Sequence, residues 1–421
     1  MARFLFTMAS SEDLGLPSRL IPVARALKDR GHDVAMINSA RAPTALITEM
    51  GIPQVVLGPL PVAQPFFDMQ AGARAFDVEH LVGLLYSDIP YLKGLTGAYQ
   101  NAFRAFRPDV VIDSFAPYSC LAARIESIPL VQVTQGNFLA DSPGFVWWEG
   151  ERPAGLASAV DAVNALAAEH GLPALRRAAD ILTGDRTFVI GSPETDPVHA
   201  GADVVHVGSL RAGQVDEGLP AWLDALGRER KLVWVYAGNP RYGGAVITTP
   251  FDSEIVLQAA LETLGDVDAD VVLTTGFQDA LAETVFPANF HVTNFVSGPA
   301  MAARCDLLIH HGGHGSVVNG LAAGKPAVIV PTNSERESNA RRLASLGVCE
   351  VVFPIDGTAT EKRIETAAFA TAVNRVLAEP SYTAAARAVG GRLAGLGGVL
   401  EIVGKIEELA SEAATRPGGR V

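Results

Sequence analysis

A run of histidines and glycines, HHGGHGS at residues 310–316, is the part of this 421-residue chain whose residue types and spacing could do chemistry. It holds three of the chain's nine histidines. One interpretation is a metal site, because His310 and His314 are four residues apart, as zinc ligands on a helix would be. The glycines between them disfavour a helix, and no glutamate stands between them to act as a base. The spacing therefore favours a use other than metal binding.

The same run has the composition of a loop that binds a diphosphate. Residues 306–309 before it predict a strand, and a helix is expected to begin near Ser316. Glycines at such a turn let the backbone approach a ligand, and the free N–H groups at the start of a helix attract phosphate. A plain tight turn would explain the glycines but not the histidines, so we favour the diphosphate interpretation.

These residues need parallel sheets to hold them, and each half of the chain predicts one. Residues 3–8 are a short apolar run typical of a buried strand, and residues 18–30 have helical spacing that ends at Gly31. Residues 33–38 predict the next strand, which completes a βαβ unit and implies parallel strands. The pattern starts again at residues 231–236. Further strands are expected at 109–112, 130–133, 188–190, 270–275, 290–295, 306–309 and 327–330.

We therefore predict an α/β chain with two Rossmann-like domains, whose parallel sheets face each other across a cleft. The first domain would cover residues 1–210 and the second residues 220–380, with a polar, glycine-rich linker at residues 211–219. Residues 381–421 would form a C-terminal helical segment and tail. The cleft between the domains is the expected place for a ligand.

The composition excludes several classes of protein. Hydrophobic residues make up 48% and charged residues 19%, which is too apolar for a disordered chain. The formal net charge of −13 disfavours nucleic-acid binding, which needs clustered Lys and Arg. Three scattered cysteines offer no disulfide framework, and neither a signal peptide nor a membrane-spanning run is visible. We expect a soluble cytoplasmic protein.

Four motifs follow one another between residues 295 and 344: Phe295-Val296, the run at 310–316, GKP at 324–326 and PTNSERESNA at 331–340. Together they resemble the donor-binding signature of the family 1 glycosyltransferases, which have the two-domain GT-B fold. That signature runs from aromatic-Val-Pro through His-His-Gly-Gly-x-Gly-Ser/Thr and Gly-x-Pro to Pro-x-x-x-Asp-Gln-x-x-Asn-Ala. The likeness is closest to the bacterial enzymes that glycosylate macrolides and similar natural products, antibiotics among them.

The resemblance implies an inverting, metal-independent transfer of a sugar from a nucleoside-diphosphate sugar, UDP- or dTDP-linked, to a small lipophilic acceptor. It implies no cofactor beyond that co-substrate. The N-terminal domain would bind the acceptor and the C-terminal domain the nucleotide sugar, and the C-terminal helix would cross back to the N-terminal domain. The expected partners are this donor and this acceptor, without nucleic acid or a membrane span, and a homodimer is one option for assembly.

Carried over position by position, the resemblance implies how the donor is held. Phe295 would flank the nucleobase, and the backbone of Val296 would pair with the edge of the base. His311 would hold the diphosphate. The loop amides and the hydroxyl that complete this cradle would come from Gly313, Gly315 and Ser316.

Three donor positions depart from the family pattern. Glu335 and Arg336 stand where the family has Asp-Gln to contact the sugar hydroxyls. Arg brings a rigid, positively charged guanidinium group that Gln lacks. One hypothesis is a sugar other than plain glucose; the alternative is that Arg336 pairs with Glu335 or Glu337 and never touches the sugar. Asn319 stands where plant relatives place a Glu for the ribose, and it would bind the ribose less strongly.

The usual catalytic base is absent. The family carries Gly-His in the loop after the first strand, and aligning the helix start puts Gly15 on the Gly and Leu16 on the His. A leucine cannot take a proton. Asp113, at the end of the strand at 109–113, is where many relatives keep the carboxylate that orients the His. It could act as the base, or Asp13 or Glu12 in the N-terminal loop could substitute.

Each of these base candidates has a simpler explanation. Asp113 could merely cap the helix that follows its strand, and Asp13 and its neighbour Glu12 could be solvated loop residues. A missing base is tolerable if the acceptor is an amine or an activated carbon nucleophile. It is also tolerable if the protein is not catalytic.

The acceptor is expected to bind in the N-terminal half, where aromatic residues gather in loops. Phe66 lies in the long stretch at 59–99, and Trp147 and Trp148 lie in a Pro/Gly-rich segment. Aromatic loops over a cleft suit an apolar, ring-containing acceptor, although core or lid packing would explain any single one of them.

Other functions compete with sugar transfer. A non-catalytic relative that activates a true transferase fits the lost histidine, and a nucleotide-sugar epimerase would share the fold. An epimerase has no need of an aromatic acceptor region. A dinucleotide oxidoreductase is disfavoured, because no G-x-G-x-x-G follows the first strand.

Overall fold

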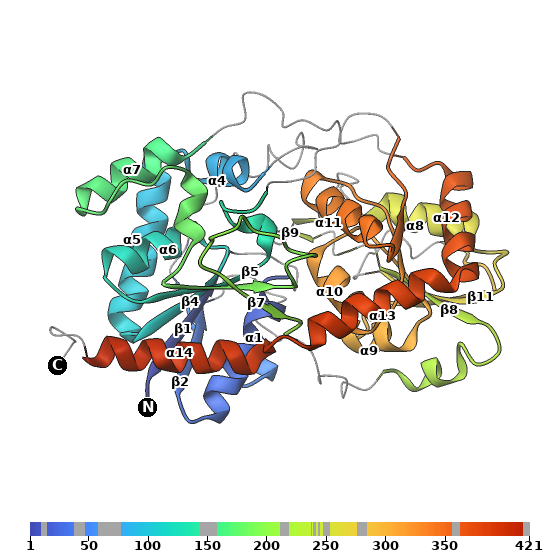
Figure 1. Ribbon diagram of the computed structural model, residues 1–421, viewed down its shortest axis with the longest axis horizontal. Helices are drawn as coiled ribbons and strands as arrows, with labels where there is room; N and C mark the ends of the chain where they lie inside the picture. Colours follow the sequence, from blue (N-terminus) through green and yellow to red (C-terminus); the bar gives the residue numbers. More distant parts are fainter. Residues whose placement is uncertain are drawn as a thin grey trace.

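The structure, a computed structural model, has two α/β halves side by side, with helices near the C-terminus running along both (Figure 1). It describes residues 1–9, 15–37, 47–57, 77–143, 158–210, 219–236, 238, 241–242, 245–246, 253–275, 284–355 and 363–415. Each half is a parallel sheet covered by helices on both faces, which confirms the predicted fold class.

The N-terminal half is built on a seven-stranded parallel sheet. Its strands in spatial order are β3 (Gln54–Val55), β2 (Asp33–Ile37), β1 (Arg3–Met8), β4 (Val110–Ser114), β5 (Leu130–Thr134), β6 (Arg186–Ile190) and β7 (Val205–Gly208). Because side chains alternate along a strand, Phe4 and Phe6 pack on one face of the sheet and Leu5 on the other. Helix α1 (Pro17–Asp29) covers the Phe4 face. The Leu5 face carries α4 (Val78–Tyr86), α5 (Ile89–Phe106), α6 (Pro117–Ile125) and α7 (Val160–Glu169).

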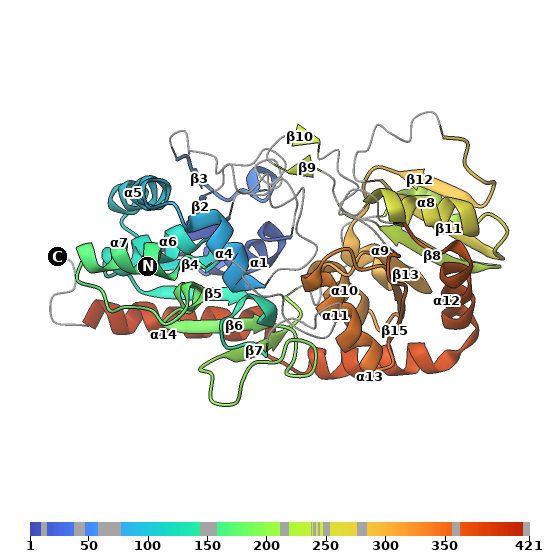
Figure 2. The same ribbon diagram turned by 90° about the horizontal axis from the view of Figure 1, so that it is seen from above.

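The C-terminal half repeats this plan with a six-stranded sheet (Figure 2). Its parallel strands in spatial order are β12 (Phe290–Thr293), β11 (Ala269–Thr274), β8 (Lys231–Tyr236), β13 (Leu307–His310), β14 (Ala327–Ile329) and β15 (Cys349–Val351). One face packs on α8 (Ser253–Thr263) and α12 (Thr366–Ala378). The other packs on α9 (Gly298–Arg304), α10 (His314–Ala322), α11 (Ser334–Ser345) and α13 (Pro380–Ala394). A separate antiparallel pair joins β9 (Arg241–Tyr242) to β10 (Ala245–Val246).

The structure differs from the sequence prediction at a few elements. Strands β7 and β15 were not predicted, because each is short and adds little periodic signal. Helix α10 begins at His314 rather than near Ser316, with Gly313 as its N-cap. The domain limits stay a prediction, and residues 211–218 of the expected linker lie outside the described residues.

The chain returns to its first half at the end, as predicted. Helix α13 packs against α10, and α14 (Gly398–Thr415) lies beside α1 on the N-terminal sheet (Figure 1). Gly390 permits the first contact, because a Cβ there would collide with the carbonyl oxygen of Leu321. Gly208, with φ +72°, permits a similar approach of β7 to the backbone of Leu393. The helix pair therefore ties α10 to the N-terminal half.

The three cysteines, Cys120, Cys305 and Cys349, are free and buried, in agreement with the lack of a disulfide framework. Within the part of the chain that the structure describes, no helix is long and apolar enough to cross a membrane.

The packing of α14 predicts where its stability contribution lies. Ile406 is fully buried against the N-terminal sheet, so Ile406→Ala should lower the free energy of unfolding by about 2–4 kcal/mol in urea titrations. Leu400 of the same helix is 70% exposed, and Leu400→Ala should change it by less than about 0.5 kcal/mol. Equal effects of the two substitutions would contradict this placement of α14.

Candidate functional site

The histidine–glycine run forms the turn from β13 into α10 at the carboxyl edge of the C-terminal sheet. Gly312 has φ +88°, and a Cβ there would lie 2.9 Å from the carbonyl oxygen of Arg336. The side-chain amide of Asn339 donates to the carbonyl oxygen of Gly312 at 3.0 Å. The turn is therefore held tightly against the first turn of α11.

The three histidines of the run have three different environments. Nδ1 of His310 accepts a hydrogen bond from the Gly312 amide at 3.0 Å, and burial lowers the pKa of this ring to about 3. His310 is thus a neutral side chain that stabilises the turn. His314 points to the other half of the chain, where its Nε2 lies 3.0 Å from Oδ1 of Asp196. The His311 ring, in contrast, packs against Gly313 of the turn.

His311 has the features of a ligand-binding residue. Its ring is packed so closely that a Cβ on Gly313 would lie 2.5 Å from Nε2 and a Cβ on Gly238 3.1 Å from Cε1. Its Nδ1 is buried and has no hydrogen-bond partner among the described residues. Burial, then the nearby charge of Arg336, holds the pKa of this ring well below its usual range, although a hydrogen bond with the backbone of Tyr236 opposes the shift. A neutral imidazole with a spare polar atom fits a hydrogen bond to a ligand oxygen.

The other predicted cradle residues surround this ring. Gly313 is the N-cap of α10, and Gly315 and Ser316 lie in its first turn, where amides have no partner within the helix. An added Cβ on Gly315 would meet no atom within 4 Å, so the backbone there is open to a ligand. Asn319 follows one turn later and is almost fully buried. The helix start thus presents N–H groups and a partial positive charge beside His311.

Phe295 and Val296 lie between β12 and α9, on the same edge of the sheet. Phe295 is 53% exposed, whereas the side chain of Val296 is buried in the core and anchors the backbone. An exposed phenylalanine at this edge offers a flat apolar surface for a base.

Glu335 and Arg336 lie in the first turn of α11, which is capped by the side chain of Asn333. Oε1 of Glu335 accepts hydrogen bonds from Asn339 and, across the two halves, from Gln135, each at 2.9 Å. Arg336 donates to the Thr332 hydroxyl at 2.9 Å, and its charge acts on His311. The guanidinium therefore lies near the cradle.

Two further contacts cross from the N-terminal half to the donor helices. The Asn137 amide donates to the Asn339 side chain at 2.9 Å, and Arg342 of α11 donates to Asn137. Sequence reasoning missed Asn137 and its neighbour Gln135, as well as Asp196, because no local pattern marks a residue whose partner lies more than a hundred positions away.

Asp113 is buried at the end of β4, and its carboxylate is surrounded by donors. Oδ2 accepts from the Thr7 hydroxyl at 2.6 Å, and Oδ1 from the Ala116 amide at 2.9 Å and the Gln132 side chain at 3.0 Å. The Ser119 hydroxyl donates to Thr7 at 2.8 Å, which extends the chain of hydroxyls. Burial raises the pKa of Asp113 to about 6, although these donors oppose the shift. The Ala116 contact holds the turn before α6 and is not a cap of that helix, whose N-cap has no side-chain cap hydrogen bond. The role of Asp113 as a base stays a prediction.

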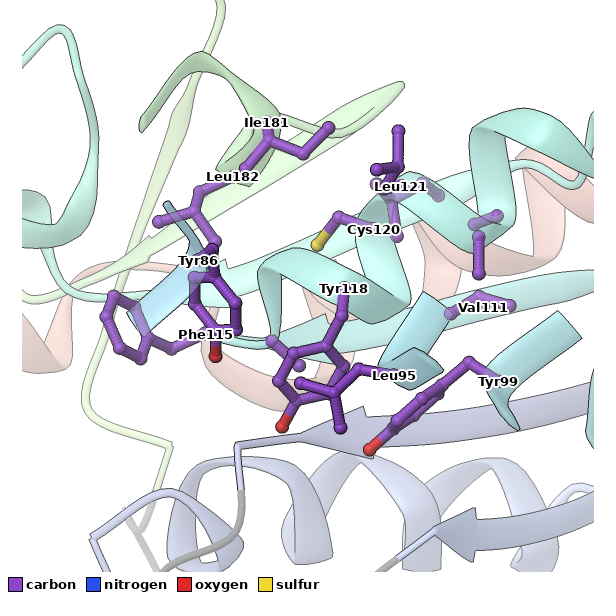
Figure 3. Packing of buried hydrophobic residues seen from close by; sticks show 14 of the residues in the cluster. Tyr86, Leu95, Tyr99, Val111, Phe115, Tyr118, Cys120, Leu121, Ile181 and Leu182 are labelled. Carbon is purple, nitrogen blue, oxygen red and sulfur yellow. The ribbon is translucent and has the colours of Figure 1, made fainter. Parts of the chain in front are cut away.

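Buried tyrosines gather above Asp113. The Tyr118 ring lies 5.5 Å from that of Tyr86 and 4.9 Å from that of Tyr99, and the hydroxyl ends of all three point to one side (Figure 3). Burial first, and the carboxylate of Asp113 in addition, raise the pKa of the Tyr86 and Tyr99 hydroxyls well above their usual range. Phe115 beside them has φ +62°, an unusual backbone conformation for a bulky residue.

Several predicted residues lie outside the described residues: Glu12, Asp13, Phe66, Trp147 and Trp148. Their roles as base or acceptor contacts stay predictions. Among the residues that are described, no group of three or more His, Cys, Asp or Glu side chains is arranged to hold a metal ion.

Comparison with known sequences finds similarity to proteins of natural-product biosynthesis. Residues 258–409 match the family described as erythromycin biosynthesis protein CIII-like, C-terminal domain. The chain is 25% identical to the 3-alpha-mycarosylerythronolide B desosaminyl transferase of Saccharopolyspora erythraea, over 93% of this chain and 95% of that protein. It is 24% identical to a PGL/p-HBAD biosynthesis glycosyltransferase of Mycobacterium tuberculosis, over 79% and 77% of the two chains.

Solved structures share the whole fold. The calicheamicin glycosyltransferase CalG4 superposes with a TM-score of 0.72 at 19% identity, over 99% of this chain and 100% of that one. The glycosyltransferase VinC, solved in complex with dTDP, superposes with a TM-score of 0.69 at 21% identity, over 97% and 100%. The resemblance to natural-product glycosyltransferases and the GT-B fold is thus confirmed.

The environment of His311 predicts a binding phenotype. In thermal-shift titrations, dTDP or UDP should raise the melting temperature of the wild type, and His311→Ala should lose most of that rise because the imidazole no longer meets the diphosphate. His291→Ala removes a partly exposed imidazole from β12 of the same half and should keep the rise. Equal stabilisation of the wild type and His311→Ala would rule out the cradle.

The raised pKa of Asp113 predicts that the stability of the folded chain depends on pH. The folded chain binds this proton more tightly than the unfolded chain, so the free energy of unfolding falls as pH rises from about 4 through about 6. The Asp113→Asn side chain cannot ionise, so its free energy of unfolding does not fall in this way. The free energy of unfolding of the variant relative to the wild type should therefore rise by about 1 kcal/mol between about pH 5 and about pH 7.5. A stability difference that stays constant with pH in urea titrations would contradict this.

Proposed function

We propose that this chain transfers a sugar from a nucleoside-diphosphate sugar to a small lipophilic acceptor of natural-product type, with inversion and without a metal ion. The observation that carries the proposal is the unpartnered Nδ1 of buried His311 beside the start of α10. The relatives support it, since they are named as a PGL/p-HBAD biosynthesis glycosyltransferase and a desosaminyl transferase that acts on 3-alpha-mycarosylerythronolide B. Its cytoplasmic location and a homodimer stay predictions.

The chemistry follows from the leaving group. As the bond from the anomeric carbon to the diphosphate breaks, negative charge grows on the diphosphate oxygens. The N–H groups at the start of α10, the His311 imidazole and the nearby guanidinium of Arg336 would stabilise that charge. Glu335 would hold the sugar hydroxyls from the first turn of α11, and Phe295 would cover the base.

The acceptor must also lose a proton to a base, and Leu16 stands where the family has its histidine base. In our proposal Asp113 receives it. The Ser119 hydroxyl donates to the Thr7 hydroxyl, which donates to Oδ2 of Asp113. A proton that reaches Ser119 can therefore be passed along these hydroxyls to the carboxylate. A pKa near 6 suits such a base close to neutral pH. Asp13 remains the other candidate.

Leu16 also favours a second function, that of a non-catalytic relative that activates another transferase. Such a protein would keep the donor cradle but not transfer the sugar. Sugar transfer and this alternative differ in whether an acceptor triggers release of nucleoside diphosphate.

A screen of dTDP- and UDP-sugars against macrolide and phenolic aglycones, with product mass and nucleoside-diphosphate release as readouts, tests the proposal. We expect an aglycone whose mass rises by one sugar, together with release that depends on the aglycone. Asp113→Asn should lower that turnover by about 100-fold while nucleoside-diphosphate binding persists. Donor binding without transfer to any aglycone would instead support the non-catalytic function.

A further inference from the structure

The two halves of the chain are joined by a buried contact between a histidine and a carboxylate. Nε2 of His314 lies 3.0 Å from Oδ1 of Asp196, and the two side chains are only 4% and 3% exposed. His314 is the first residue of α10, the helix that carries the proposed diphosphate cradle. Asp196 follows β6 of the N-terminal half, so the pair bridges the donor cradle and the opposite half.

The N-terminal half is shaped to hold Asp196. Oδ1 also accepts from the Gly136 amide at 3.0 Å, and Oδ2 from the Thr195 hydroxyl at 3.0 Å. Gly191, with φ +116°, leaves room for the carboxylate, because a Cβ there would collide with Oδ2. Although burial opposes it, the charge and hydrogen bond of His314, with the Gly136 amide, hold the pKa of Asp196 below its usual range. The carboxylate is therefore fixed and ionised.

The neighbouring contacts reach the same helices. Gln135 and Asn137 flank Gly136, and they bond to Glu335 and Asn339 of α11. Asn339 in turn bonds to the carbonyl oxygen of Gly312 inside the cradle. The segment at 135–137 thus contacts α11 directly, and Asp196 joins it to the first residue of α10.

A second interdomain pair provides a comparison. Arg392 of α13 makes two hydrogen bonds to Glu194, at 2.7 and 3.0 Å, but its side chain is 55% exposed and that of Glu194 is 29% exposed. Solvent screens such a pair, and its removal has little effect. Removal of one partner from the His314–Asp196 pair leaves a buried charge without its partner, which is strongly unfavourable.

We propose that His314 and Asp196 are a positioning pair that holds the start of α10, and with it the donor diphosphate, in a fixed place relative to the acceptor half. This inference rests on the proposed function. Neither side chain touches substrate in this proposal; each acts by setting where the anomeric carbon lies with respect to the acceptor and its base. Sugar transfer needs the two halves in a fixed relative position, whereas nucleoside-diphosphate binding needs only the C-terminal half.

The pair therefore predicts a split between binding and turnover. Asp196→Asn should leave the calorimetric affinity for dTDP or UDP close to that of the wild type and lower kcat for acceptor-dependent release by about 10–100-fold. His314→Asn, which removes the other partner of the pair, should likewise keep the affinity and lower kcat. The double variant should be no slower than the slower single variant, because the two side chains act as one unit. Glu194→Gln is the control and should keep kcat.

Small-angle X-ray scattering gives a readout that does not need activity. Both single variants should show a larger maximum dimension than the wild type and Glu194→Gln, because the halves are less firmly joined. If the wild type transfers no sugar, the proposed function fails, but the scattering comparison still tests the pair. Unchanged dimensions in both folded variants, unchanged kcat, or independent additive losses would overturn the inference. If Asp196→Asn does not fold, the same readouts of His314→Asn decide.

Discussion

The buried contact between His314 and Asp196 is the constraint on which the arrangement of the site depends. Each half of the chain has its own sheet, so the position of one half relative to the other depends on contacts between them. Val318 of α10 packs into the hydrophobic cluster of the N-terminal sheet. The buried pair, the contacts of Gln135 and Asn137, and the return of α14 are further contacts of this kind. A buried charge tolerates few geometries, because any shift that separates it from its partner leaves it unsolvated.

The net charge of −13 raises the question of how an acidic chain would hold an anionic donor. The site offers a local answer, with helix amides, a neutral His311 and the guanidinium of Arg336 close together. Oriented dipoles in a confined space attract an anion without a basic surface. The same logic applies to Asp113, where burial that costs stability raises the pKa toward the value a base needs.

The fold and the donor side of the site could be predicted from the sequence, because their signals are local. Apolar runs and helical spacing mark most strands and helices, and the run at 310–316 marks the cradle. The interdomain contacts could not be predicted, since Asp196 lies far from His314 in sequence and no local pattern marks it. The short strand β7 escaped prediction for lack of periodicity. The tyrosine cluster around Tyr118 was not predicted, because it depends on tertiary packing of α4, α5 and α6.

A crystal structure with the nucleoside diphosphate that stabilises the chain most would test the central claim most directly. Phosphate oxygens are expected within hydrogen-bonding distance of the His311 ring and of the amides that begin α10. The base is expected against Phe295, and the His314–Asp196 contact is expected to be unbroken. A diphosphate bound elsewhere, or a His311 ring that makes no contact with it, would contradict the account.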